Sequence, residues 1–182
     1  TLSWLCSKFD GTIPFSDLVL EAQKMGFTEP DPREDLSGRD MQRKLLILAR
    51  ELGLELDLDD ISLSALMPET LAIGSWDDFL ANESTLNDFI DAHAANAKAQ
   101  SSVLRYTGLL EITENKVTAQ VGITYTPIGD ALANLTPGDN IFVINSKWYS
   151  ANALVIQGPG AGKEVTAAGI HSDLYWLVQN IK

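Results

Sequence analysis

Acidic residues, two prolines and a lysine gather in the segment from residue 29 to residue 44, called the acidic segment below. Pro30 and Pro32 restrict their own φ angles and push the preceding residues towards extended geometry. The carboxylates of Glu29 and Asp31 are therefore expected on a stiff, non-helical stretch. Such carboxylates suit an ammonium group, so the segment indicates a binding site for an amino acid.

Asp40 and Lys44 are four residues apart, with the acid first, which is the arrangement in which two such side chains face each other on a helix. One interpretation is an ordinary solvated ion pair, and geometry alone favours it. The other is a half-buried lysine with an adjustable pKa, held in place by the acid and able to move protons. The spacing leaves both open.

A helix from about Ser37 must position this pair, capped by Ser37 or by Asp35 and ended by Gly53. Its apolar residues recur at helical spacing on one face: Met41, Leu45, Leu48 and Leu52.

The acidic segment lies within a longer pattern: Ala22-x-x-x-Gly26-Phe27-Thr28-Glu29-Pro30-Asp31-Pro32, followed by Asp35-Leu36-x-Gly38-x-Asp40-x-x-x-Lys44. This pattern resembles the homoserine dehydrogenase signature without a departure. The similarity continues at Thr1–Ser3, Val103–Tyr106, Gly158–Gly162 and Thr166–Gly169, and so covers nearly the whole chain. Thr1–Leu5 and Leu154–Gly160 look most like the bifunctional aspartokinase/homoserine dehydrogenase of the methionine branch.

The resemblance implies interconversion of L-homoserine and L-aspartate 4-semialdehyde with NAD or NADP, within threonine and methionine biosynthesis. It places Glu29 on the substrate amino group with Asp35 close by, and it places Thr1 near the substrate. Lys44 matches the proposed proton donor, assisted by Asp40, because a carbonyl that becomes an alkoxide needs a proton or a cation beside it.

The resemblance also implies a homodimer or higher oligomer, and a dinucleotide-binding half upstream of this chain that carries a second acid/base lysine. The chain has no strand followed by Gly-x-Gly-x-x-Gly, so that half is expected to be missing here. The whole of residues 1–182 is predicted to be one substrate-binding, catalytic and dimerisation domain.

The composition of the chain limits the classes of molecule that it is expected to bind. The chain has 13 basic and 25 acidic residues and a net charge of −12, which disfavours nucleic acid and anionic membrane surfaces. The single cysteine excludes an internal disulfide, and no apolar run approaches 18 residues, so a cytoplasmic protein is expected. Cys6 is predicted to be a packed apolar residue, and the separated His93 and His171 predict no metal site.

The remaining pattern predicts an α+β fold, with a mixed or antiparallel sheet of about four or more strands covered on one face by helices. Helices are expected at residues 2–9, 15–25 and 164–180, with Ser16 as a cap of the second, and two consecutive helices at 76–98. Strands are expected at 61–66, 140–144 and 154–156, and a hairpin at 103–125.

Gly158–Gly162 joins the last strand to the last helix and matches neither the Walker A nor the dinucleotide-binding template. From the residues alone, a tight connection is the simpler interpretation. The resemblance instead implies that Gly160, Ala161 and Gly162 lie against the cofactor and substrate.

Two other classes of function stay open. One is a non-catalytic module that binds or senses an amino acid, and the other is an oligomerisation module. Asp40 and Lys44 favour the enzyme, because a pure binding module has no need of a lysine beside the carbonyl position.

Overall fold

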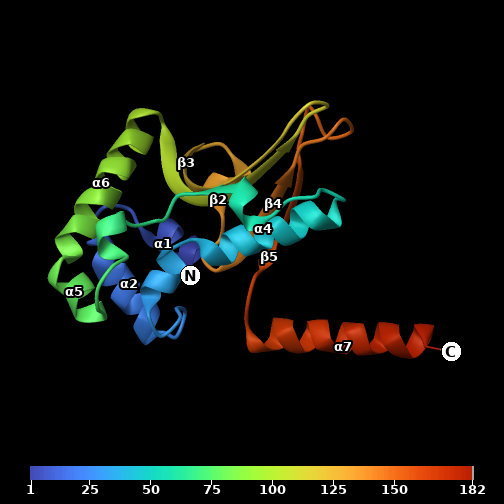
Figure 1. The fold of residues 1–182 in the computed structure, drawn as a ribbon, viewed down its shortest axis with the longest axis horizontal. Helices are drawn as coiled ribbons and strands as arrows, with labels where there is room; N and C mark the ends of the chain where they lie inside the picture. Colours follow the sequence, from blue (N-terminus) through green and yellow to red (C-terminus); the bar gives the residue numbers. More distant parts are fainter. Residues whose placement is uncertain (182) are drawn as a thin grey trace.

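Seven α-helices and two small β-sheets make up the fold within residues 1–181, the part of the chain that the computed structural model describes (Figure 1). The α-helices are α1 (Leu2–Lys8), α2 (Phe15–Lys24), α3 (Pro32–Leu36), α4 (Arg39–Glu51), α5 (Trp76–Ala81), α6 (Glu83–Ala99) and α7 (Lys163–Asn180). The strands are β1 (Ile61–Leu63), β2 (Ser102–Ile112), β3 (Val117–Pro127), β4 (Asp139–Ile144) and β5 (Leu154–Pro159). The α+β class predicted from the sequence is confirmed, as are the paired helices α5 and α6.

The larger sheet has three strands in the order β1-β3-β2. β2 and β3 form the predicted antiparallel hairpin, with Leu104 opposite Tyr125 and Tyr106 opposite Ile123. β1 pairs with the other edge of β3 in parallel, which makes the sheet mixed. Because side chains alternate along a strand, Leu104 and Tyr106 share one face of the sheet with their partners, and that face is buried.

β4 and β5 form a separate antiparallel sheet, with Ile144 opposite Leu154. The sequence predicted one sheet of about four strands, and in this detail the prediction was wrong. The alternation of apolar and polar residues shows that a segment is a strand, but it does not name the strand that takes its hydrogen bonds.

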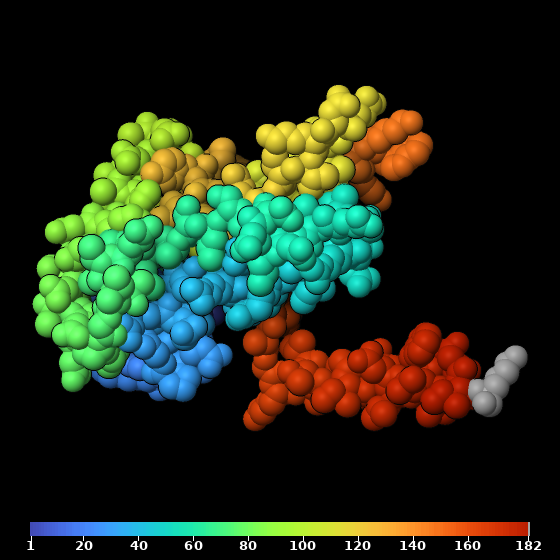
Figure 2. All heavy atoms as spheres, viewed as in Figure 1, coloured from blue at the N-terminus to red at the C-terminus, as the bar shows by residue number. Residues whose placement is uncertain are grey.

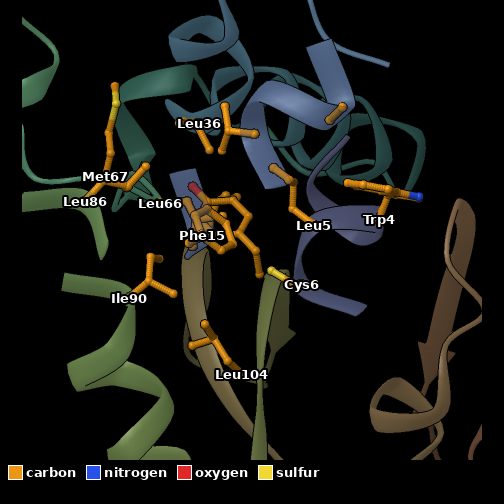
Figure 3. Packing of buried hydrophobic residues seen from close by; sticks show 14 of the residues in the cluster. Trp4, Leu5, Cys6, Phe15, Leu36, Leu66, Met67, Leu86, Ile90 and Leu104 are labelled. Atoms are coloured by element: carbon orange, nitrogen blue, oxygen red, sulfur yellow. The ribbon is translucent and has the colours of Figure 1, made fainter. Parts of the chain in front are cut away.

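Helices cover one face of the three-stranded sheet, as predicted. Leu45 of α4 lies against Gly108 of β2, which shares the face of Leu104. His93 of α6 makes a 2.8 Å hydrogen bond to the hydroxyl of Tyr125, on the same face of β3. A core of buried apolar side chains fills the space between sheet and helices (Figure 3): Leu5, Phe15, Leu36, Leu66, Leu86, Ile90 and Leu104.

α2 starts differently from the prediction. Its N-cap is Pro14, and Ser16 lies inside the helix, buried, with its backbone N–H donating to Asn87 Oδ1 at 2.8 Å. The side chain of an asparagine 71 residues away thus accepts a backbone N–H of the first turn, which a local cap residue was expected to accept. Cys6 is buried in the core as expected, and burial raises the pKa of its thiol to about 12.

α7 leaves the rest of the molecule after β5 and projects away from it (Figures 1 and 2). None of its residues is buried, although many are large and apolar. Those exposed by more than half are Ile170, Leu174, Tyr175, Trp176 and Val178. None of the described helices is long and apolar enough to cross a membrane.

Candidate functional site

A short helix that was not predicted from the sequence, α3, shapes the first half of the acidic segment. Its N-cap is Asp31, whose Oδ1 accepts a 3.0 Å hydrogen bond from the backbone N–H of Arg33, and Pro32 occupies the first helical position. An acid followed by proline is a common helix start, so this signal was present in the sequence. The prolines shape the segment, but its stiffness comes partly from a helix.

Arg33 ties this helix to a neighbouring part of the chain. Its guanidinium lies 2.6 Å from the carboxylate of Asp31 and donates a 2.9 Å hydrogen bond to the carbonyl of Gly74. Hydrogen bonds from the Arg33 side chain lower the pKa of Asp31 below its ordinary value. The carboxylate of Asp31 is therefore engaged in holding the segment together and is not free to bind a ligand.

Asp35 organises the turn that carries Glu29. The backbone N–H of Glu29 donates a 2.8 Å hydrogen bond to Asp35 Oδ2, and the hydroxyl of Thr28 donates to the carbonyl of Glu29 at 2.8 Å. The Glu29 side chain stays exposed. One acid thus holds the backbone of the turn while the other remains available to a ligand.

Gly38 begins the helix that carries the ion pair, so the prediction that Ser37 or Asp35 would cap it was wrong. Gly38 is the N-cap of α4 with φ +75°, a conformation that favours glycine. The predicted end is confirmed: Leu52 is the C-cap, and Gly53 follows with φ +80°.

The Lys44 ammonium lies 2.8 Å from Asp40 Oδ2, as the spacing predicted. The two side chains are 62% and 63% exposed, which is the solvated arrangement in this chain. The buried stripe of α4 is also rotated from the predicted one, because Leu45, Leu46 and Ala49 face the core.

Thr1 lies beside this pair. Its hydroxyl donates to the carbonyl of Phe27, next to the turn of Glu29. The backbone nitrogen of Thr1 is within electrostatic range of the carboxylates of Asp35 and Asp40 and of the Lys44 ammonium. Thr1, Asp35, Asp40 and Lys44 therefore lie in one region of the molecule, and Glu29 joins them through Asp35.

The glycine loop of residues 160–162 lies next to the start of β4 instead. The backbone N–H of Gly160 points to the carbonyl of Gly138 at 3.5 Å, and a Cβ at Gly160 would lie 2.5 Å from the Asn140 side chain. Gly162 has φ +130° and is the N-cap of α7. Within residues 1–181, no hydrogen bond joins this loop to the acidic segment, although Ser3 of α1 donates to the carbonyl of Asp139 at 2.9 Å.

The five clustered residues are not enclosed. A hollow of about 470 Å³ lies at the other end of α4, between Arg50 and Asp57, and a smaller one of about 280 Å³ lies near Asp78. Neither is lined by Thr1, Glu29 or Lys44. Within the described residues, no group of three or more His, Cys, Asp or Glu side chains is placed to hold a metal ion.

The fold and the site together define an α+β domain with a cluster of acids and one lysine around its first residue. The family model described as homoserine dehydrogenase matches residues 1–175. The chain belongs to the homoserine dehydrogenase family.

The similar proteins agree with this assignment. The chain is 45% identical over 179 residues to bifunctional aspartokinase/homoserine dehydrogenase 2 of Escherichia coli, covering 98% of this chain and 22% of the relative. It is 35% identical over 187 residues to homoserine dehydrogenase of Saccharomyces cerevisiae, covering 100% of this chain and 51% of that protein. The chain thus spans about a fifth of the bifunctional relative and half of the yeast enzyme.

Solved structures share the fold. A Candida auris protein described as of unknown function superimposes with a TM-score of 0.88 at 34% identity, covering 99% of this chain and 51% of that one. A homoserine dehydrogenase of Staphylococcus aureus gives a TM-score of 0.76 at 22% identity, covering 98% of this chain and 40% of that one.

Proposed function

We propose that this chain is the substrate-binding half of an NAD(P)-dependent oxidoreductase that interconverts L-homoserine and L-aspartate 4-semialdehyde in threonine and methionine biosynthesis. The observation that carries the proposal is the Asp40–Lys44 ion pair on α4, the helix that directly follows the Asp35–Glu29 turn and α3. The amino group of the substrate can bind carboxylates on one side of the cluster. The carbonyl of the substrate then lies beside the Lys44 cation on the other side.

Lys44 then donates the proton to the oxygen of the aldehyde as hydride arrives at carbon, and removes it in the opposite direction. Asp40, 2.8 Å away, holds the Lys44 amino group in position. Glu29 binds the amino group, Asp35 fixes the backbone of Glu29, and Thr1 lies at the edge of the substrate.

NAD or NADP supplies the hydride when bound, mainly to a dinucleotide-binding domain upstream of this chain. The start of α7 is compatible with a contact to that cofactor, because no side chain caps it and its first backbone N–H groups favour an anion. In this proposal Gly160, Ala161 and Gly162 bring that helix start towards the cofactor.

A covering domain also accounts for two features of the chain. The Asp40–Lys44 pair is solvated here, whereas proton transfer works best where water is excluded. α7 is apolar on several sides and covered on none, although such helices are normally buried.

The proposal is tested by joining this chain to the upstream residues of the Escherichia coli relative and following homoserine-dependent reduction of NADP. The joined protein is expected to turn over and the isolated chain to be inactive. Absence of activity in the joined, folded protein, together with calorimetric binding of homoserine, would favour a binding module instead.

Glu29→Gln in the joined protein is expected to raise KM for homoserine with a smaller effect on kcat, because the exposed carboxylate binds the ground state and the transition state alike. Glu34→Gln is the matched control, since it removes an exposed acid of the same segment. Steady-state kinetics at saturating NADP measures both. An unchanged KM in Glu29→Gln would remove Glu29 from the amino-group site.

Hydrogen exchange tests the proposed burial of α7. Its amides are expected to exchange at least about tenfold more slowly in the joined protein than in the isolated chain, because covering its apolar side chains stabilises the helix. The β2–β3 hairpin, already packed in this chain, serves as the internal reference. Equal exchange of α7 in both proteins would contradict a contact with the added domain.

We further propose a cytoplasmic homodimer. The separate β4–β5 sheet supports a contact between copies, because Phe142, Ile144 and Ile156 on it are exposed by more than 40%. Light scattering of the joined protein checks the assembly, and a monomer at micromolar concentration would contradict it.

A further inference from the structure

Tyr106 of β2 and Gly38 at the start of α4 fit together at unusually close range. A Cβ added to Gly38 would lie 1.8 Å from Tyr106 Oη and 2.7 Å from Tyr106 Cζ. Both distances are far below any real contact, so the end of the tyrosine ring occupies the space that a side chain would need. The backbone of α4 therefore starts directly against the ring.

The ring itself is held firmly. Tyr106 is 7% exposed, and its hydroxyl donates a 2.7 Å hydrogen bond to the carbonyl of Ser64. The backbone N–H of Ser64 donates in turn to the carbonyl of Val121 at 2.9 Å, which fixes Ser64 to β3. Burial raises the pKa of the Tyr106 hydroxyl, so it stays a hydrogen-bond donor at neutral pH.

Two further contacts keep the first turns of α4 in place. The backbone N–H of Gln42 donates a 3.0 Å hydrogen bond to the carbonyl of Gly38, and this is the bond with which the helix begins. Leu45 also packs over Gly108, two residues after Tyr106 on the same face of β2, because a Cβ added to Gly108 would lie 3.5 Å from Leu45 Cδ1. Tyr106 and Gly108 thus form one seat beneath the residues that flank Asp40 and Lys44.

We propose that Tyr106 is a positioning residue for the Asp40–Lys44 pair, acting through Gly38 to set where α4 begins above the sheet. The inference rests on the function proposed for Lys44. Tyr106 does not touch the pair; it fixes the helix from which both side chains extend. Its hydroxyl sets the height of that helix, because the hydroxyl is the tyrosine atom nearest to the position that a Gly38 side chain would occupy.

Tyr106→Phe in the joined protein tests this, because it removes the hydroxyl and keeps the ring. We expect kcat to fall about 10- to 100-fold, the cost of a misplacement of about 1 Å, with KM for homoserine changed less than about twofold. Hydrogen exchange should quicken at residues 40–44 and stay unchanged at the end of α4.

Tyr125→Phe is the matched control. It removes a buried-face tyrosine hydroxyl from the adjacent strand, where the hydroxyl bonds to His93 instead of lying under α4. We expect a comparable change in melting temperature and no loss of kcat. Equal losses of kcat in the two variants would overturn the inference, because a general loss of stability would then explain both.

A double-mutant cycle with Lys44→Ala separates the inference from the function on which it rests. If Tyr106 acts through Lys44, then Tyr106→Phe lowers kcat in the native background and not in the Lys44→Ala background. The same loss in both backgrounds overturns the inference. Full activity of Lys44→Ala overturns the proposed role of Lys44 and the inference with it, whereas full activity of Tyr106→Phe beside an impaired Lys44→Ala overturns the inference alone.

Discussion

Lys44→Ala is expected to lower kcat for homoserine oxidation by roughly two to four orders of magnitude in the protein joined to its dinucleotide-binding domain, the usual range for a positioned acid/base. KM should change little, because the carboxylates that hold the amino group remain. The stability should also change little, because an exposed i,i+4 ion pair contributes only about 0.3–0.5 kcal/mol. A large loss of activity without a loss of stability is therefore the signature of proton transfer by this lysine.

Arg43→Ala provides the control for Lys44→Ala. Arg43 is the preceding residue of the same helix, is exposed, and also carries a positive charge. Its removal changes the net charge equally and should leave kcat within about twofold. If Lys44→Ala were as active as Arg43→Ala, then Lys44 would be only the surface partner of Asp40.

Gly38→Ala is expected to lower the free energy of unfolding by about 2–5 kcal/mol. The left-handed backbone at Gly38 costs an alanine about 1–2 kcal/mol, and the collision with the buried ring of Tyr106 adds about 1–3 kcal/mol. Chemical denaturation of the isolated chain measures the change. That loss is a large fraction of the about 5–15 kcal/mol by which native proteins are stable, so a lower yield of folded protein is also expected.

Gly53→Ala separates the two causes. Gly53 ends α4 with φ +80°, nearly the angle of Gly38, but a Cβ there would meet nothing within 4 Å. This variant should lose only the backbone contribution of about 1–2 kcal/mol. Equal losses at Gly38 and Gly53 would show that the ring of Tyr106 moves aside at little cost.

Features set by neighbours in the sequence were predicted well. Gly53 ends α4, Asp40 and Lys44 pair across one turn, and the β2–β3 hairpin forms, because each depends on residues a few positions apart. The acidic segment was found for the same reason, since its acids and its lysine occur within one short stretch. The missed helix α3 also had a local signal, the acid and proline at its start.

Features set by distant partners were not predicted. Leu48 and Leu52 belong to the apolar pattern of α4, but they are exposed by 39% and 63%, because the sheet contacts the side of the helix that carries Leu45 and Ala49. The fit of Gly38 to Tyr106 requires knowing that β2 passes beneath α4. The roles of Glu29, Lys44 and the other site residues came from resemblance, because residue types and spacing alone left a solvated ion pair open.

The seat of α4 also bears on the order in which the chain folds. The turns around Asp31 and Asp35 close over a few residues, and such short loops form quickly. The hydroxyl of Tyr106 bonds to the carbonyl of Ser64, 42 residues earlier in the chain, and its ring packs against Gly38, which is earlier still. These contacts can form only once β2 has joined the sheet. The acidic segment should therefore acquire its local shape early and its final place late, and substitutions at the seat should mainly speed unfolding rather than slow folding.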